Sequence, residues 1–178
     1  MLKKILIALA AIVAIFVIVV ALQPSEFRVE RSTKIAAPAE TVFAQVNDLH
    51  KWDAWSPWAK LDPNAKISIE GSESGTGSIL HWSGNSQVGE GTMTLTESRP
   101  NELIKIKTDI AKPMQVSNNS EFNFKPEGDQ TQVTWAVYGH QNFVGKAFCL
   151  VMNGKKMMGE LLDKGLAQLK TVAEASKP

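Results

Sequence analysis

The sequence predicts an α+β fold: an antiparallel sheet of about seven strands covered by one long C-terminal helix, with one transmembrane helix in front. Three observations lead to this prediction. Residues 5–22 are an unbroken apolar run, residues 65–138 alternate between short strand patterns and turns, and residues 155–175 form a long amphipathic pattern. A sheet with one apolar face needs a cover, and the amphipathic helix is long enough to supply it.

The apolar run would span roughly 27 Å as a helix, close to the thickness of a hydrocarbon core. We therefore expect an uncleaved single-pass anchor at residues 1–24, followed by one domain at residues 25–178. A cleaved signal peptide is the main alternative, because residues 19–21 (Val-Val-Ala) are an acceptable cleavage site. A buried helix of a soluble protein is the third interpretation.

The orientation of this anchor is not fixed by the count of basic residues. Lys3 and Lys4 precede the span, but Arg28, Arg31 and Lys34 follow it. The short basic head resembles the start of an export signal. We therefore expect a cytoplasmic N-terminus and an exported domain.

Charge and cysteine content narrow the function classes. The chain has 19 Lys and Arg against 18 Asp and Glu, and Lys3 and Lys4 lie before the span, so the domain is nearly neutral. This balance gives no electrostatic case for nucleic-acid binding. Cys149 is the only cysteine, which excludes an intrachain disulfide, and we expect it to be a small buried side chain.

The elements follow in order from their periodicity. Residues 26–35 alternate and predict the first strand, and Pro38 opens a short helix in which Val42, Phe43 and Val46 repeat at helical spacing. Further strands are expected where apolar residues alternate between turn signals. Their approximate ranges are 67–69, 78–82, 91–99, 102–109, 115–125 and 131–138.

Two features frame this sheet. Tryptophans at positions 52, 55 and 58 repeat every three residues, as on one face of a helical turn, and would either plug one end of the sheet or gate a cavity. At the other end of the chain, a short helix near 144–152 precedes the long helix near 155–175. The apolar stripe of the long helix contains Met158, Leu162, Gly165, Leu169 and Val172, and Met157, Leu161 and Leu166 widen this stripe.

This order of elements, with Asn-Asp-Leu-His-Lys-Trp-Asp-Ala-Trp-Ser-Pro-Trp at 47–58, Ala-Ala-Pro-Ala-Glu-Thr-Val-Phe at 36–43 and Gly-Leu-Ala-Gln-Leu-Lys at 165–170, resembles the polyketide cyclase/dehydrase group of the START and pollen-allergen-like (SRPBCC) superfamily. The resemblance covers residues 26–174 and extends to members with an N-terminal membrane span. It implies a helix-grip fold, in which a curved sheet wraps around the C-terminal helix and encloses a hydrophobic cavity. The superfamily includes lipid carriers, receptors, cyclases and co-chaperone modules, so fold alone does not choose a function.

The alternation of side chains along each strand predicts which residues face this cavity. If Met93 and Leu95 face the helix, Glu97 does too, and Thr108, Asn118 and Ser120 follow from the registers of their own strands. In strand 78–82, either Leu80 and Trp82 or Ile79 and His81 face inward. The expected ligand-binding residues are Trp82, Met93, Leu95, Glu97, Ile106, Asn118, Ser120, Phe122, Trp135, Met158 and Leu162.

Three functions remain open. The favoured one is membrane-tethered binding or carrying of a hydrophobic small molecule or lipid in an internal cavity. An alternative is a cyclase or dehydratase that uses a cavity carboxyl such as Glu97, or His81, as a general acid or base. The other alternative is a protein-interaction module. No catalytic set, metal site, cofactor site or nucleic-acid partner is predicted, and the oligomeric state is left undefined.

Overall fold

The structure is a computed structural model that describes residues 1–176. Helix α1 (Leu2–Leu22) leads into strand β1 (Glu26–Ile35), which is followed by three short helical segments. These segments are α2 (Ala39–Asn47), the 3₁₀ helix η1 (Leu49–Lys51) and α3 (Trp52–Trp55). Six strands come next: β2 (Lys66–Gly71), β3 (Ser78–Ser83), β4 (Glu90–Arg99), β5 (Leu103–Lys112), β6 (Val116–Glu127) and β7 (Gln130–His140). The described chain closes with α4 (Phe143–Met152) and α5 (Gly154–Ala175).

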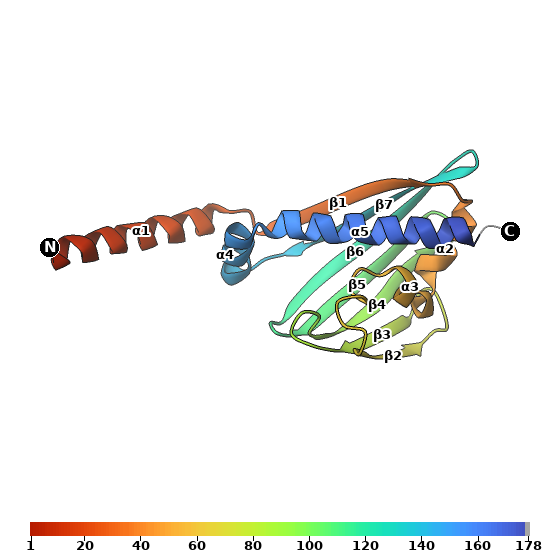
Figure 1. Ribbon diagram of the computed structural model, residues 1–178, viewed down its shortest axis with the longest axis horizontal. Helices are drawn as coiled ribbons and strands as arrows, with labels where there is room; N and C mark the ends of the chain where they lie inside the picture. Colours follow the sequence, from red (N-terminus) through yellow and green to blue (C-terminus); the bar gives the residue numbers. More distant parts are fainter. Residues whose placement is uncertain (177–178) are drawn as a thin grey trace.

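The seven strands form one antiparallel sheet in the order β1-β7-β6-β5-β4-β3-β2. Strands β2 to β7 are a meander, and β1 joins it by pairing with β7. Helix α5 lies across one face of this sheet, and α2 and α3 lie near the C-terminal end of α5 (Figure 1). The predicted fold class is confirmed, including the long C-terminal helix and the apolar N-terminal helix.

The contact between α5 and the sheet follows the predicted stripe. Leu162, Leu166 and Leu169 are buried in the core that α5 shares with the sheet. Gly165 lies where the helix comes closest to Trp135: a Cβ added there would stand 2.6 Å from the Cζ3 atom of that ring. Met157, expected to widen the stripe, is instead 46% exposed, so the buried face is narrower at the start of the helix.

Two tryptophans close the end of the sheet next to α2. Trp52 and Trp55 are buried and both lie edge-on to Phe122, with ring centroids 6.1 and 6.0 Å from it. Their indole Nε1 atoms donate to the carbonyl oxygens of Val46 and Gln45, which ties α3 to the end of α2. These two side chains therefore act as the plug that their spacing allowed.

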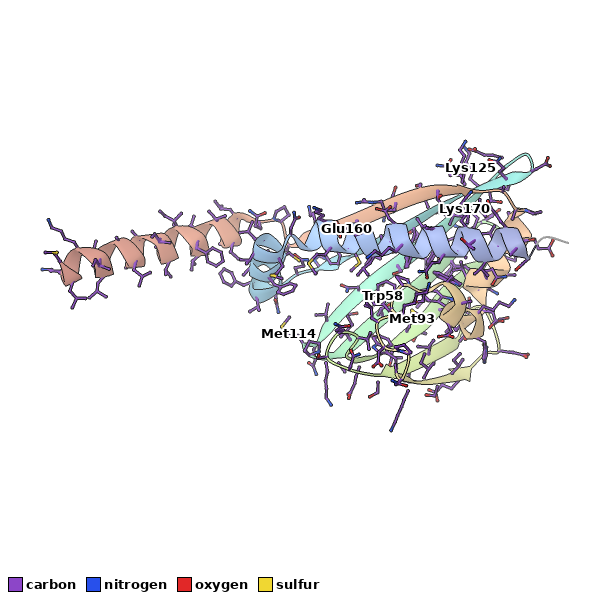
Figure 2. All side chains as sticks on the ribbon, viewed as in Figure 1. Trp58, Met93, Met114, Lys125, Glu160 and Lys170 are labelled. Atoms are coloured by element: carbon purple, nitrogen blue, oxygen red, sulfur yellow. The ribbon has the colours of Figure 1, made fainter. Side chains whose placement is uncertain are left out.

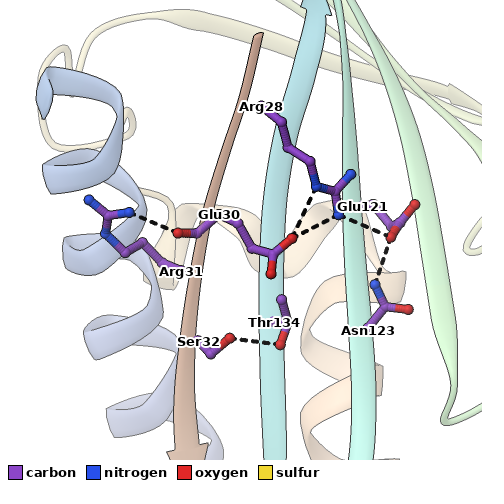
Figure 3. Close-up of polar contacts among 7 residues, drawn as sticks. All are labelled: Arg28, Glu30, Arg31, Ser32, Glu121, Asn123 and Thr134. Carbon is purple, nitrogen blue, oxygen red and sulfur yellow. Dashed lines mark hydrogen bonds and ion pairs between the residues drawn. The ribbon is translucent and has the colours of Figure 1, made fainter. Parts of the chain in front are cut away.

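The face of the sheet away from α5 is polar. Arg28 bonds Glu30 at 2.8 Å and reaches Glu121 at 3.6 Å, and Ser32 and Thr134 share a hydrogen bond of 2.8 Å. Figure 3 shows these contacts. Exposed pairs of this kind contribute little to stability. They do identify this face of β1, β7 and β6 as the solvent side.

Helix α1 extends away from the domain (Figure 1). Among its 21 residues, Val20 is the buried one. In the described part of the chain, α1 is the one helix long and apolar enough to be a membrane span or a signal sequence.

Candidate functional site

A cavity of about 500 Å³ lies between the helical cover and the inner face of the sheet. That volume is within the range of roughly 300–1,000 Å³ usual for small-molecule sites. Helix α5 contributes Met158, and the α3 region contributes Trp52, Ser56 and Trp58. The apolar wall from the sheet consists mainly of Ile67, Ile69, Leu80, Trp82, Met93, Ile110 and Val137.

Trp82 forms one wall because of the register of β3. Ser78 and Leu80 are buried, so Trp82 shares their inward face and His81 points outward. The indole Nε1 donates to the Val88 carbonyl oxygen at 3.0 Å. Gly91 is its partner on β4, where an added Cβ would lie 2.4 Å from the ring, so the glycine lets the indole lie flat on the strand.

Two polar atoms in the cavity wall have no protein partner. Trp135 is 1% exposed, yet its Nε1 has no acceptor among the described residues, and the Oδ1 atom of Asn118 has no donor. Buried polar groups are normally hydrogen-bonded, and leaving one unpaired costs about 1–3 kcal/mol. Each of these atoms has less than 1 Å² of accessible surface, so a ligand would reach it only if the side chains around it moved.

The residues expected to bind a ligand separate into three groups. Trp82, Met93, Asn118, Ser120, Trp135 and Met158 line the cavity. Leu95, Ile106, Phe122 and Leu162 are fully buried in the packed core beside it and are not part of its wall. Glu97 belongs to neither group.

A β-bulge moves Glu97 to the outer face of the sheet. Leu95 pairs with Ile106, but Glu97 pairs with Lys105, so β4 carries one extra residue between them. One extra residue reverses the alternation, because successive side chains point to opposite faces. Glu97 bonds Lys105 at 2.7 Å, and this hydrogen bond is the main cause that lowers the pKa of the Glu97 carboxyl.

The ionisable groups of the cavity lie at its rim. His81, the other candidate for acid–base chemistry, bonds Glu70 and Thr92 on the outer face. His50 does line the cavity, and its Nδ1 lies 2.9 Å from the Asp48 carboxylate, with the imidazole 57% exposed. Asp62 accepts backbone N–H bonds from Asn64 and Asn85, so it joins two loops at the mouth.

Part of the cavity was not foreseen from periodicity. Most of this part of the lining comes from loops, which contribute Ala59, Asp62, Pro63, Ala65, Gln87, Val88 and Pro113. Asp53 of α3 and Lys112, the last residue of β5, complete it. The sequence signal for this region was the spacing of Trp52, Trp55 and Trp58, of which Trp52 and Trp58 line the cavity. Within residues 1–176 there is no group of three or more His, Cys, Asp or Glu side chains that could hold a metal ion.

Comparison with known proteins gives a family and a fold. Residues 26–174 match the sequence profile of the family described as "Polyketide cyclase / dehydrase and lipid transport". No curated protein matches the sequence.

Solved structures of the same shape are distant in sequence. The protein TTHA0849 from Thermus thermophilus is 17% identical with a TM-score of 0.60, and MLL2253 from Mesorhizobium loti is 14% identical with a TM-score of 0.61; each comparison covers 85% of this chain and 100% of the other. The di-domain ARO/CYC protein StfQ from the steffimycin biosynthetic pathway is 10% identical, with a TM-score of 0.59 over 84% of this chain and 50% of its own. At these identities the similarity shows the fold and leaves activity open.

Proposed function

The chain belongs to the polyketide cyclase/dehydrase and lipid transport family, and from this premise we propose that it is a membrane-tethered protein that binds or carries a hydrophobic small molecule or lipid in its cavity. Family membership supports a hydrophobic ligand-binding or cyclase-like role. The lining of the cavity favours ligand binding over catalysis. Its wall is mainly apolar, and the two expected acid–base groups, Glu97 and His81, lie on the other face of the sheet.

The polar side chains on the sheet wall of the cavity suggest the class of ligand. Thr108, Asn118 and Ser120 lie among side chains that are mainly apolar. A molecule with an apolar body and a hydroxyl, carbonyl or carboxyl group could hydrogen-bond with them. A pure hydrocarbon would make no such bond and would gain only from burial of its surface.

The tether rests on α1. Its 21 residues are apolar throughout except for Lys3 and Lys4, and its length matches that of a transmembrane helix. We infer that α1 stays attached and holds the cavity at the membrane surface. A ligand from the bilayer would then reach the cavity without crossing bulk water.

The test is the molecule that copurifies with the full-length chain. Protein extracted in a mild detergent should carry a hydrophobic, lipid-sized compound that organic extraction and mass spectrometry detect. Met93→Trp, which fills the cavity, should lose most of it, whereas Thr94→Trp, on the opposite face of the same strand, should retain it. Equal ligand content in the two variants, or none in the parent, would contradict the proposal and leave an interaction module as the better account.

A cyclase or dehydratase is the second candidate, and one observation favours it. The imidazole of His50 lies at the cavity mouth, and Asp48 holds its Nδ1, which leaves Nε2 free to act as a general acid or base. Substitution His50→Gln would then abolish turnover of a bound polyketide-like substrate while ligand content stays unchanged. Under the binding proposal, the parent protein forms no product and His50→Gln has no effect on ligand content.

A further inference from the structure

Helix α4 is mainly apolar and exposes its large side chains. None of its ten residues is buried, and Lys146 is its one charged residue. Helices of this length are marginal in water on their own, so packing must stabilise them. The exposed fractions of its large apolar side chains run from 41% to 67%, at Phe143, Val144, Phe148, Leu150, Val151 and Met152.

The position of α4 ties it to the end of α1. The Nζ atom of Lys146 donates to the carbonyl oxygens of Ala21 and Gln23, at 3.1 and 2.8 Å, where α1 ends. Figure 1 shows α4 between α1 and α5, set crosswise to both. If α1 runs through a bilayer, its C-terminal end lies at the membrane surface, and α4 lies there parallel to the membrane plane.

A second apolar group lies at the same end of the domain. Met114, in the loop between β5 and β6, is 47% exposed, and Figure 2 shows it at the end of the sheet nearest α4. Lys125 and Lys170 lie at the opposite end. The end of the domain beside α1 thus carries exposed apolar side chains on α4 and at Met114, together with the exposed side chains of Glu26 and His140.

We propose that α4, together with Met114, is embedded in the headgroup–acyl boundary of the bilayer that α1 crosses. This inference rests on the proposed function, because it needs α1 as a membrane span. An interfacial helix buries its apolar face about 5–10 Å into this boundary. The occupant is lipid for two reasons. First, α1 holds α4 at the membrane surface. Second, Lys146 is the one charged side chain of α4 and its amine is bonded to the end of α1, so the exposed side chains of α4 carry no charge.

The arrangement also orients the cavity. Lys112 and Pro113 line the cavity and directly precede Met114 in the chain. If Met114 dips into lipid, this part of the cavity wall lies at the membrane surface. A bilayer molecule then has a short path from the membrane into the site.

Fluorescence of a single attached probe tests this placement on the full-length chain. Cys149 is the only cysteine, and Cys149→Ser keeps an acceptor for Gln141, whose Nε2 bonds the sulfur at 3.0 Å. In this background Val151→Cys, labelled with the environment-sensitive dye NBD, is placed in phosphatidylcholine vesicles. The expected result is a blue-shifted emission, most of which is lost when the vesicles contain lipids with a spin label near the headgroup. Lys125→Cys, at the far end, serves as the matched control and should keep a water-like emission.

Each outcome decides between accounts. A water-like emission at position 151, or a blue-shifted emission that spin-labelled lipid does not quench, would overturn the proposal; the second result would indicate a protein partner or a second copy. Ile12→Cys, in the middle of α1, reports the span separately, through quenching by a spin label deep in the acyl chain. Loss of quenching at Ile12 would remove the tether and this inference together, whereas loss at Val151 alone would remove only the interfacial helix.

Discussion

Replacing Gly165 with alanine sets two effects of known size against each other. Gly165 lies inside α5, where alanine is favoured over glycine by about 1 kcal/mol. The added methyl group would stand 2.6 Å from Trp135 Cζ3 and 3.1 Å from Pro57 Cδ, well inside the optimal carbon separation of about 3.5–4.0 Å. One of these buried groups must therefore move.

Trp135 has little room to move. It stacks on Phe122 with ring centroids 4.7 Å apart, and Trp55 and Trp58 contact it edge-on at 5.9 and 5.8 Å. Overpacking of this kind costs about 1–3 kcal/mol. After the helix gain of about 1 kcal/mol, we expect Gly165→Ala to lower the free energy of unfolding by about 0–2 kcal/mol.

Gly159 provides a control in the same helix. The three atoms nearest to a Cβ added there belong to the guanidinium of Arg31, the far end of a flexible side chain that is 40% exposed and bonded to Asp163. Displacing that surface pair costs about 0–1 kcal/mol, so Gly159→Ala should be neutral or up to about 1 kcal/mol more stable than the parent. Denaturant unfolding of the full-length protein in detergent, followed by tryptophan fluorescence, measures both. If Gly165→Ala proved more stable than the parent, α5 would not pack on Trp135 as described.

Three further predictions concern the anchor, the pH dependence and the cavity. Full-length protein should pellet with membranes and resist alkaline carbonate extraction; a soluble mature form that begins near Leu22 would show that α1 is a cleaved signal. Because Lys105 lowers the pKa of Glu97 in the folded state, the stability from this pair is complete above the ordinary carboxyl pKa of about 4 and is lost as pH falls through the lower folded value. The midpoint of thermal unfolding should therefore fall less steeply below that pH in Glu97→Gln than in the parent, and identical pH profiles would contradict the pairing. Asn118→Ala and Ser120→Ala should each weaken ligand binding about two- to tenfold, as loss of one neutral hydrogen bond does, while Glu97→Gln should leave binding unchanged in the same titration.

Most of the fold could be predicted because it depends on patterns that the sequence carries directly. Strand alternation and turn residues placed the strands close to their observed bounds, and the helical stripe identified the buried face of α5 around Leu162 and Leu169. Met157 departs from that pattern because it lies in the first turn of α5, directly after α4, and is 46% exposed. Sequence periodicity shows that a side chain is apolar but not whether protein or lipid covers it.

The candidate site was harder to predict, for reasons that are local. Alternation assigns a face by counting residues, so the single bulge between Leu95 and Glu97 reversed the expected side of Glu97. The unpaired Nε1 of Trp135 could not be foreseen either, because the other buried tryptophans of the same region, such as Trp52, do find a carbonyl partner. Such differences depend on where backbone oxygens lie in space, which sequence alone does not state.

Site-specific photo-crosslinking in native membranes tests the central claim most directly, because it requires no detergent and works before the ligand has been identified. A p-benzoylphenylalanine residue is placed at position 93, which faces the cavity, or at position 94, which faces outward on the same strand. After illumination, mass spectrometry should find an adduct of lipid-like mass on the protein that carries the probe at 93 and none on the protein that carries it at 94. Absence of an adduct at 93, or equal adducts at both positions, would contradict the account of a ligand-filled cavity.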